Sequence, residues 1–568
     1  MRVPLLVVLA MAFILPYPSV ARSDPTEAAN PVATLPSQIR MQWTRETTVD
    51  AYDSIGNRDQ KWDGRAQQTL EAAARNWGKS PLRNGDEDMI VLSASEAAIK
   101  AGCRDPLVVY ARARMLVLFQ AEPREVAKLQ EGMAQAFLAS KYPAIRKCYG
   151  LLRAAQVQVQ AEPDNAKTRD AARALVEEAM KMFPEAFADP RLPREEVVTS
   201  LGVASDASVA IEGNPSALRD RLVEILEKSI QPKAAILTAR GEMAVFDGWM
   251  ARGGGFANTV TPEGWRILHD RMAAGRALLD EAWELDPTSF ELARMQLDVE
   301  THESHGGDTM EKWFSTATKL DPDDPRPYAA KLNWLEPKWH GSEEDMLAFG
   351  RECAATERWS GLVPLVLVEA HWAVGRYGGD GYPPAPHREY FQRDPKIWEE
   401  IKPIYDRYLR EPNPSNYHKT RYAVIAAYSG HWKEANALFR SVKPALRPTD
   451  VLYDRDAMNA LMKEAAMESR KQSEADRASR LAAGKLPLAN DVFISARWGG
   501  GNNWVDVTEK VKEWLSGDDD FWADNDTLGS DPTPGWRKHL EITYKAAGKP
   551  RTISVDEDAK VPAAKLKP

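Results

Sequence analysis

The 568-residue sequence has only three cysteines, and beyond its N-terminus it has no apolar run long enough to span a bilayer. Three cysteines are too few for a disulfide-framework fold or a cysteine-based zinc site. A membrane-spanning helix needs about 20 apolar residues, and the most apolar later stretch, 361–374, is interrupted by Pro364, Glu369 and His371. We therefore expect no membrane span after the N-terminal segment.

Histidine is also unevenly distributed, because all nine histidines lie at or after His269. The one close pair, His302 and His305, lacks the spacing that puts both rings of a zinc protease on one helix face. The acidic stretch 518–531 lacks an oxygen ligand and the closing glutamate of a calcium loop. No phosphate-binding loop or Gly-x-Ser-x-Gly motif is present. These absences predict no metal, no cofactor and no catalytic activity.

The composition is that of a globular protein, with 43% hydrophobic residues and a formal net charge of −9. The basic residues are scattered, with no basic stripe. The negative net charge and the scattered basic residues both argue against a nucleic acid as the main partner.

Residues 1–21 have the pattern of an export signal: Arg2, an apolar run from Val3 to Leu15, and the small-residue cleavage site Ser19-Val20-Ala21. The apolar run is too short to cross a bilayer, although a retained membrane anchor is the alternative. Residues 22–41 are predicted to be a disordered leader, since 22–36 are rich in proline, alanine and serine.

Residues 42–450 are predicted to form an array of helical hairpins. Two segments ending at Pro287 and Pro322 repeat one helical face 35 residues apart, close to the period of about 34 residues of a helical-hairpin repeat. Each proline can neither donate a backbone hydrogen bond nor leave its neighbour helical, so each helix must stop there. A glycine cluster at 253–255 suggests a division of the array into two sub-domains near 253–261.

Two of the cysteines, Cys103 and Cys148, lie near the beginnings of a predicted helix and of the next but one. Alternate helices of a hairpin stack run parallel, so these beginnings can meet. A disulfide between Cys103 and Cys148 is one interpretation, and two buried thiols are the other.

The pairs ending at Pro287 and Pro322, together with the hairpin at 421–440, resemble degenerate tetratricopeptide repeats. In that hairpin, Gly430, Ala435 and Phe439 follow one another at the repeat's spacing. The first-helix signature is mostly absent, so the resemblance is to the hairpin geometry. The segment 331–349 also resembles a tetratricopeptide-like bacterial domain of unknown function, through its turn at 337–342. The resemblance implies a mainly α fold, an α-solenoid, and no catalytic activity.

The spacing of the apolar residues changes from a helical to a strand-like pattern after residue 484. Residues 451–484 are predicted to be a charged linker helix, and four segments within 485–560 alternate or cluster as strands. Ala547-Gly548-Lys549-Pro550 is predicted to be a hairpin turn between two of them. The fold expected for 485–560 is a small β-sandwich, followed by a disordered tail at 561–568.

This C-terminal module resembles the domain of unknown function found at the C-terminus of some J-domain proteins and of many bacterial exported proteins. Three segments carry the resemblance: Trp504-Val505-Asp506-Val507-Thr508, then Leu528-Gly529-Ser530-Asp531-Pro532 with Pro534-Gly535, then Lys538. The module covers about an eighth of the chain, and the role of that family is obscure.

Tryptophan is abundant, and an indole can stack on a sugar because it has a flat apolar face and a polar edge. Trp504 and Trp514 are expected in the core of the module. Trp522 and Trp536, on predicted loops, are the candidate ligand contacts there, and Trp339 is the candidate in the helical array.

The sequence thus favours an exported, non-enzymatic helical-repeat scaffold in the bacterial periplasm or outside the cell. Its partner would be a protein or peptide bound on a concave surface, with the β-module as a second docking unit. Two alternatives stay open. One is a carbohydrate-binding envelope protein that uses Trp522 and Trp536, and the other is a hydrolase with carboxylate catalysis.

Overall fold

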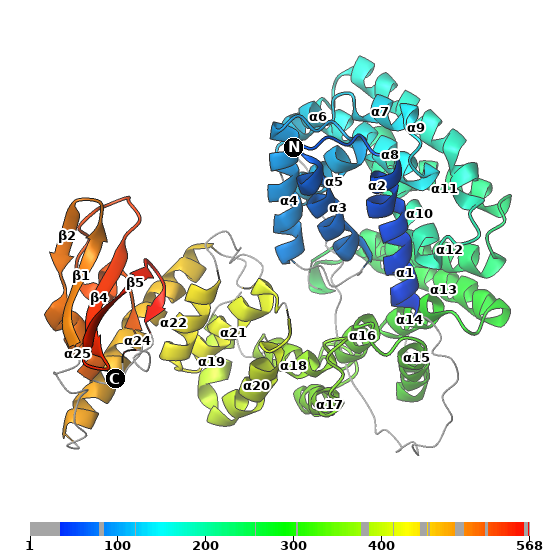
Figure 1. The fold of residues 1–568 in the computed structure, drawn as a ribbon. Coiled ribbons are helices and arrows are strands. Elements are labelled where there is room, and N and C mark those ends of the chain that lie inside the picture. Colours follow the sequence, from blue (N-terminus) through cyan, green and yellow to red (C-terminus); the bar gives the residue numbers. More distant parts are fainter. Residues whose placement is uncertain are drawn as a thin grey trace, which may run out of the picture. The chain divides into compact units, whose positions relative to one another are not determined.

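The protein is seen in a computed structural model in which helices predominate and a small antiparallel sheet lies near the C-terminus (Figure 1). The structure describes residues 35–78, 85–119, 121–255, 257–302, 305–376, 385–412, 414–442, 451, 455–482, 493–516, 521–561 and 566. The predicted export signal and most of the predicted leader and tail lie outside these residues. None of the described helices combines the length and apolar character that a bilayer span requires.

The chain divides into two compact units. Unit 1 comprises residues 1–377 and 400–415, and unit 2 comprises 378–399 and 416–568. The sub-domain break predicted near 253–261 does not coincide with this division, and the helices on either side of it, α12 (Lys233–Arg252) and α13 (Pro262–Leu285), pack along each other within unit 1.

The helices of unit 1 follow one another closely, mostly joined by short loops. They are α1 (Pro36–Arg45), the π-helical turn η1 (Glu46–Asp50), α2 (Ala51–Ile55), α3 (Asp63–Gly78), α4 (Gly85–Lys100), α5 (Pro106–Leu118), α6 (Pro123–Leu129), α7 (Met133–Ala139), α8 (Ala144–Ala161), α9 (Ala166–Phe187), α10 (Arg194–Glu212), α11 (Ser216–Glu227), α12 (Lys233–Arg252), α13 (Pro262–Leu285), α14 (Phe290–Glu300), α15 (Gly307–Leu320), α16 (Arg326–Trp334), α17 (Glu343–Ala355) and α18 (Val366–Gly375). Helix α20 (Pro395–Tyr408) belongs in part to each unit.

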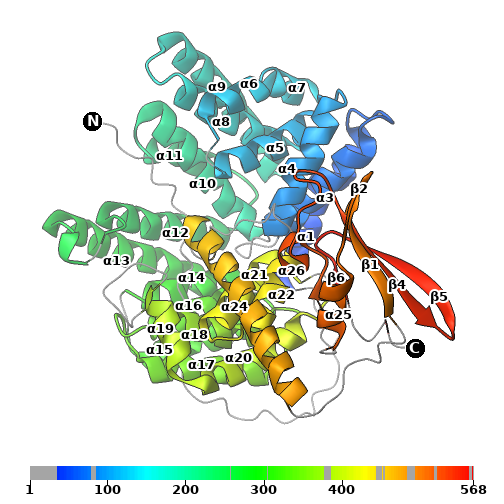
Figure 2. The same ribbon diagram turned by 90° about the vertical axis from the view of Figure 1, so that its left-hand side faces the viewer.

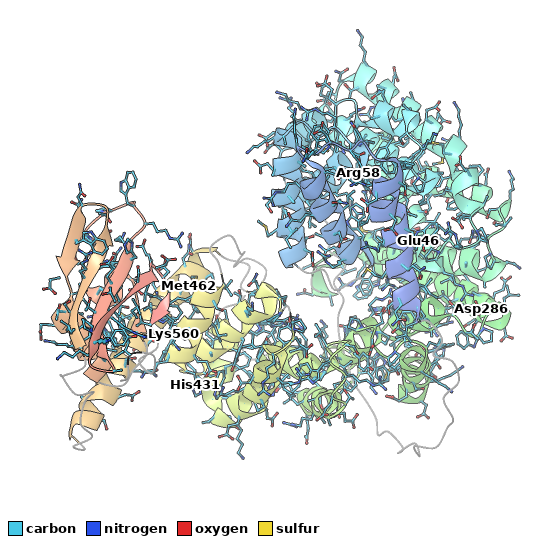
Figure 3. All side chains as sticks on the ribbon, in the orientation of Figure 1. Glu46, Arg58, Asp286, His431, Met462 and Lys560 are labelled. Atoms are coloured by element: carbon cyan, nitrogen blue, oxygen red, sulfur yellow. The ribbon has the colours of Figure 1, made fainter. Side chains whose placement is uncertain are left out.

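The two predicted helix ends are confirmed. Helix α13 ends at Leu285 and α15 at Leu320, each directly before an Asp-Pro pair, and Asp286 is labelled in Figure 3. The two aspartates have similar backbone angles, with φ −151° and ψ 81° in Asp286 and φ −144° and ψ 92° in Asp321. Their N–H groups donate to the carbonyls of Ala282 and Ala317, which are both fully buried. The repeated sequence therefore encodes a repeated local structure.

Helices of unit 1 pack both on the next helix and on the next but one. The second kind of contact joins α8 to α10, α10 to α12, α12 to α14, α14 to α16 and α16 to α18. In Figure 1 the helices from α3 to α13 follow one another around an arc, and α1 lies on its inner side. Helix α1 begins at Pro36, so the predicted disordered leader 22–41 is helical from that residue onward.

Unit 2 begins with helices and ends with the sheet. Its helices are α19 (Ala385–Arg393), α21 (Asn416–Tyr428), α22 (Trp432–Ser441), α24 (Arg455–Ala482), α25 (Thr508–Ser516) and α26 (Asn525–Leu528). The hairpin predicted at 421–440 is confirmed by α21 and α22, with Gly430 at φ +77° between them. His431 in this turn stacks on Trp398, with ring centroids 4.2 Å apart (Figure 3). The predicted linker helix is α24, which packs on α21 and α22.

The strands form a four-stranded antiparallel sheet in the order β2-β1-β4-β5 and a separate pair of β3 with β6 (Figure 2). Their bounds are β1 (Phe493–Gly500), β2 (Asn503–Asp506), β3 (Phe521–Trp522), β4 (His539–Ala546), β5 (Lys549–Asp556) and β6 (Lys560–Val561). Alternate residues of β1 and β4, including Trp498 and Leu540, share a core with residues of α25, β3 and β6. The layer that covers the four-stranded sheet thus combines helix α25 with the two-stranded sheet of β3 and β6.

The turn between β4 and β5 carries a strained residue. Ala546 pairs with Lys549, which leaves Ala547 and Gly548 as a two-residue loop with φ +52° and +75°. Positive φ at both positions defines a type I′ turn, which Asn-Gly fits well and alanine fits poorly.

Ala547→Asn is expected to stabilise unit 2 by about 0.5–1 kcal/mol, because asparagine tolerates positive φ better than alanine does. Ala547→Val is expected to destabilise it, because a β-branched side chain is the least compatible with positive φ. Hydrogen exchange of the β4 and β5 amides, compared for the two variants, measures both effects. Equal protection in both variants would contradict this assignment of the turn.

Candidate binding surfaces

Helix α1 lies on a polar surface of unit 1 that we call the α1 seat: Gly78, Arg146, Glu195, Glu196, Asp321 and Asp324. Arg40 of α1 reaches three of these residues. Its Nε donates to the carbonyl of Gly78 at 2.6 Å, while Nη1 and Nη2 lie 3.2 and 3.5 Å from the carboxylates of Glu195 and Asp324. One buried guanidinium therefore joins α1 to the end of α3, to α10 and to the turn before α16.

The other contacts between α1 and its seat are also polar. Trp43 donates its indole N–H to Glu196 at 3.3 Å. Arg146 donates to the hydroxyl of Thr47 from two guanidinium nitrogens, at 3.0 and 2.7 Å. At the other end of the helix, the backbone N–H of Ser37 donates to Asp321 at 2.9 Å. The repeat aspartate Asp321 therefore both ends α15 and holds the start of α1.

A network of charges continues from the seat across α10, α12, α14 and α16, and it is buried at its centre and half-buried at Glu242 and Asp298. Its centre is Glu291 of α14, which accepts from Arg294 and from Arg326, the latter at 3.0 Å. Arg326 also holds Asp324 of the seat, at 2.8 Å. On the far side, Arg294 pairs with Asp298 and lies 3.7 Å from Glu242 of α12.

The network shifts the pKa values of its acids in opposite directions. Burial opposes ionisation of Glu291, but the guanidinium groups of Arg294 and Arg326 outweigh it and lower its pKa to about 2. At Glu242 burial dominates and raises the pKa to about 7, because Arg294 compensates only in part. Burial also raises the pKa values of Glu195 and Asp298. Within the described part of the chain, no three His, Cys, Asp or Glu side chains are placed to hold a metal ion.

The predicted ligand contact Trp339 lies in an aromatic cluster at the ends of α12, α14 and α16. The ring of His302 meets the edges of Trp249 and Trp339, with centroids 4.0 and 4.6 Å away. Burial lowers the pKa of His302 to about 3, so the ring is neutral. Trp339 is half-buried, and its indole nitrogen has no hydrogen-bond partner among the described residues. Packing against His302 therefore accounts for the position of Trp339, and its indole N–H is a donor that the described residues leave unused.

In the C-terminal module, two of the segments that resemble a known domain form the walls of one pocket. Residues 505–510 line one side and 528–530 the other, around a volume of about 410 Å³. The indole N–H of Trp498 donates to the carbonyl of Ser530 and to Asn525, both at 3.1 Å, and so fixes the second wall. Segments that are separate in the sequence are thereby brought to a single place.

Lys538, the third part of that pattern, fixes the loop that follows the pocket. It is 3% exposed and pairs with Asp531 at 3.1 Å and Glu557 at 3.0 Å, and it also donates to the carbonyl of Trp536 at 3.0 Å. This single ammonium group thus connects the loop at 531–536 to the residue just beyond β5.

Lys538→Met is expected to destabilise the module by about 1–2 kcal/mol, because methionine replaces the stem but makes none of these charge-assisted bonds. The loss is limited, since Asp531 and Glu557 can regain water. Proteolysis of the loop at 531–536 should accelerate in Lys538→Met and stay unchanged in the control Lys549→Met, at an exposed position of β5. Unchanged cleavage in Lys538→Met would contradict the role of the ammonium group.

The four tryptophans considered in the module differ in their surroundings. Trp536 is 77% exposed, whereas Trp522 is half-buried in β3 with the guanidinium of Arg440 5.0 Å from its ring centre. Trp514 is buried as expected. Trp504 is only half-buried, and it contacts Arg497 and His539 instead of the core. The expectation of a core position for Trp504 was wrong because β2 is an edge strand whose side chains lie at the rim of the sheet.

The disulfide interpretation of Cys103 and Cys148 is corrected by the structure, where both are buried free thiols. The sulfur of Cys148 instead donates to the carbonyl of Ala179 at 3.5 Å.

No family model, no curated protein and no solved structure matches this chain.

Proposed function

We propose that this chain is an exported, non-enzymatic helical-repeat protein that binds a protein or peptide partner on the inner face of unit 1. In this proposal the hairpins form a tetratricopeptide-like solenoid, and the C-terminal module serves as a second docking unit. The single observation that carries it is the α1 seat, where the array holds a helical segment through carboxylates and hydrogen bonds.

Three features support binding on this face. The contacts between alternate helices α8 to α18 are those of a stacked repeat, whose inner surface is extended. The charged side chains of the seat and of the network come from α8, α10, α12, α14, α16 and the turn before α16, so a segment bound there meets a charge pattern that it can match. The export pattern at 1–21 supports a partner in the cell envelope or outside the cell.

Photo-crosslinking in vivo tests this proposal. A photoreactive amino acid replaces Thr199 of α10, one turn beyond Glu195, or Asp298 of α14, and a control chain carries it at the exposed Arg266 of α13. We expect one defined partner to crosslink from both inner positions and not from the control. Crosslinks at the control level from both inner positions would overturn the proposal.

Carbohydrate binding is the second candidate, and the exposure of Trp536 favours it. Its indole ring is free to stack on a sugar, whereas Arg440 covers the ring of Trp522. A glycan array probed with the full chain should show binding that Trp536→Ala abolishes and Trp522→Ala leaves unchanged. The absence of binding by the wild-type chain would eliminate this candidate.

A further inference from the structure

The buried side of α1 is mostly polar. Its buried residues are Arg40, Trp43 and Thr44, and Thr47 follows on the same side in η1. These positions are three or four residues apart, so they form one helical face. Trp43 is the only residue of α1 in the hydrophobic core, and Ile39 is 45% exposed. Helix α1 therefore makes several ion pairs and hydrogen bonds to its seat, with Trp43 as its one residue in the core.

Such contacts are exchangeable in a way that core packing is not. When an ion pair or hydrogen bond opens, water replaces much of the lost interaction, whereas exposing an apolar side chain has no such compensation. Apart from Trp43, the chain enters the hydrophobic core from Val49 onward, with Ala51 and Tyr52. When helix α1 leaves its seat, Trp43 is therefore the one residue of α1 that is withdrawn from the core.

A break in the helix lies at the boundary between these two parts. Residues 46–50 form η1, one turn of π-helix between α1 and α2. Turns of this kind are rare and occur frequently at functional sites. In Figure 3 the label of Glu46 marks this position. The α-helical hydrogen-bond pattern changes to a π-helical one there, and kinks in helices occur at such turns.

The seat itself requires a cation. Four of its six residues are the carboxylates Glu195, Glu196, Asp321 and Asp324, and its only cation is Arg146. Arg326 neutralises Asp324 in part, but Arg40 alone joins Glu195 to Asp324. When α1 leaves, Glu195 and Asp324 lose the guanidinium of Arg40, so the empty seat favours an occupant that supplies another cation. A planar guanidinium suits it better than an ammonium group, because it can reach several acceptors at once.

We propose that α1 is an exchangeable occupant of its seat, and that the partner is a helix presenting the same side chains. The partner helix would carry arginine, tryptophan three residues later and a small hydroxyl residue seven residues later, as Arg40, Trp43 and Thr47 do. Helix α1 then acts as a built-in competitor that only a matching helix displaces. This inference rests on the proposed function, since it names the partner of the same surface.

A labelled peptide of residues 36–50 tests the exchange. Its binding by fluorescence anisotropy is compared between the wild-type chain and a chain carrying Arg40→Ala and Trp43→Ala. The tethered α1 competes at an effective concentration in the millimolar range. We therefore expect the substituted chain, whose own α1 is weakened, to bind the peptide at least tenfold more tightly than the wild-type chain. Equal binding by the two chains overturns the proposal.

The specificity is tested on the peptide. Against the substituted chain, a peptide with Arg40→Ala is expected to bind at least tenfold more weakly than the wild-type peptide, and one with Gln42→Ala, on the exposed side, should bind equally. Equal binding of the Arg40→Ala peptide overturns the role of the guanidinium. Circular dichroism first shows whether the substituted chain is folded.

Hydrogen exchange of the wild-type chain gives a second measurement that needs no substitution. The amides of α1 are expected to exchange at least 100-fold faster than those of α10, because α1 opens locally. Exchange of α1 as slow as that of α10 overturns the proposal. A partner crosslinked at Thr199, with no peptide exchange, overturns only the role of α1. Peptide exchange without any crosslinked partner overturns only the proposed function.

Discussion

Replacing Arg326 by methionine is expected to lower the free energy of unfolding of unit 1 by about 3–5 kcal/mol, the usual cost of removing one member of a buried ion pair. Arg326 is the link between Glu291 and Asp324, at 3.0 and 2.8 Å. Methionine has a similar reach but leaves both carboxylates facing a buried apolar group. Hydrogen exchange of the α14 and α16 amides, resolved by mass spectrometry at increasing urea concentration, measures the loss within unit 1.

The loss should depend on pH. In the native protein the pKa of Glu291 is lowered to about 2, so its ionisation stabilises the fold above a pH of about 4.5, and this contribution is lost as the pH falls towards 2. Without Arg326 the pKa of Glu291 rises and this stabilisation shrinks. The difference between variant and wild type should therefore be largest near pH 7 and smaller near pH 4.

Arg266→Met is the matched control. Arg266 of α13 also has two acidic partners, Glu263 and Asp270, at 2.6 Å each, but all three side chains are about 60% exposed. Exposed pairs contribute little, so a change below about 0.5 kcal/mol is expected. Similar losses of unfolding free energy in Arg266→Met and Arg326→Met would show that burial does not increase the contribution of the network to stability.

The local structure of the repeats could be predicted because their signals are local. A proline two residues after each helix end, and Ser342 before α17, act within one turn of the chain. Ser342 caps α17, accepting from the backbone N–H of Asp345 at 3.2 Å. The hairpin turn at Ala547 was found in the same way. In such places the order of a few residues is sufficient to specify the structure.

The α1 seat could not be predicted because its members are far apart in the sequence. Arg40 and Asp324 are 284 positions apart, and each is one of many charged residues, 74 basic and 83 acidic. No local pattern indicates which of them will meet. The boundary predicted between the disordered leader 22–41 and the helical array falls between Arg40 and Trp43, so their shared helical face was not recognised. Only the fold shows that this face is buried.

The C-terminal module lies between these two cases. Its strands followed from their alternation, and the resemblance drew attention to the segments that line the pocket. The covering layer was not predicted, because β3 and β6 contain two residues each and are too short to have a period. Trp504 was misplaced since alternation indicates which residues share a face of the sheet, but not whether the strand is at the edge.

Glu242→Gln is expected to stabilise unit 1 at high pH and to leave it unchanged at low pH. Burial raises the pKa of Glu242 from 4.5 to about 7, and its Oε2 has no hydrogen-bond partner among the described residues. A raised pKa means that the stability is fully present below pH 4.5 and is lost as the pH rises through 7, because ionising the buried carboxyl is unfavourable. By linkage the loss at pH 8 is on the order of 3 kcal/mol. Glutamine does not ionise, so it avoids this loss.

The measurement is the unfolding free energy of unit 1 at pH 4, 6 and 8, from hydrogen exchange of the α12 and α14 amides. The variant and the wild type should agree at pH 4 and diverge steadily to pH 8, with the variant the more stable. Glu224→Gln, at an exposed position of α11, should show no such divergence. A variant that is less stable than the wild type at pH 8 would mean that the attraction between Glu242 and Arg294, 3.7 Å apart, outweighs the cost of burying the charge. The network would then be held together by its ion pairs on the α12 side as well as around Glu291.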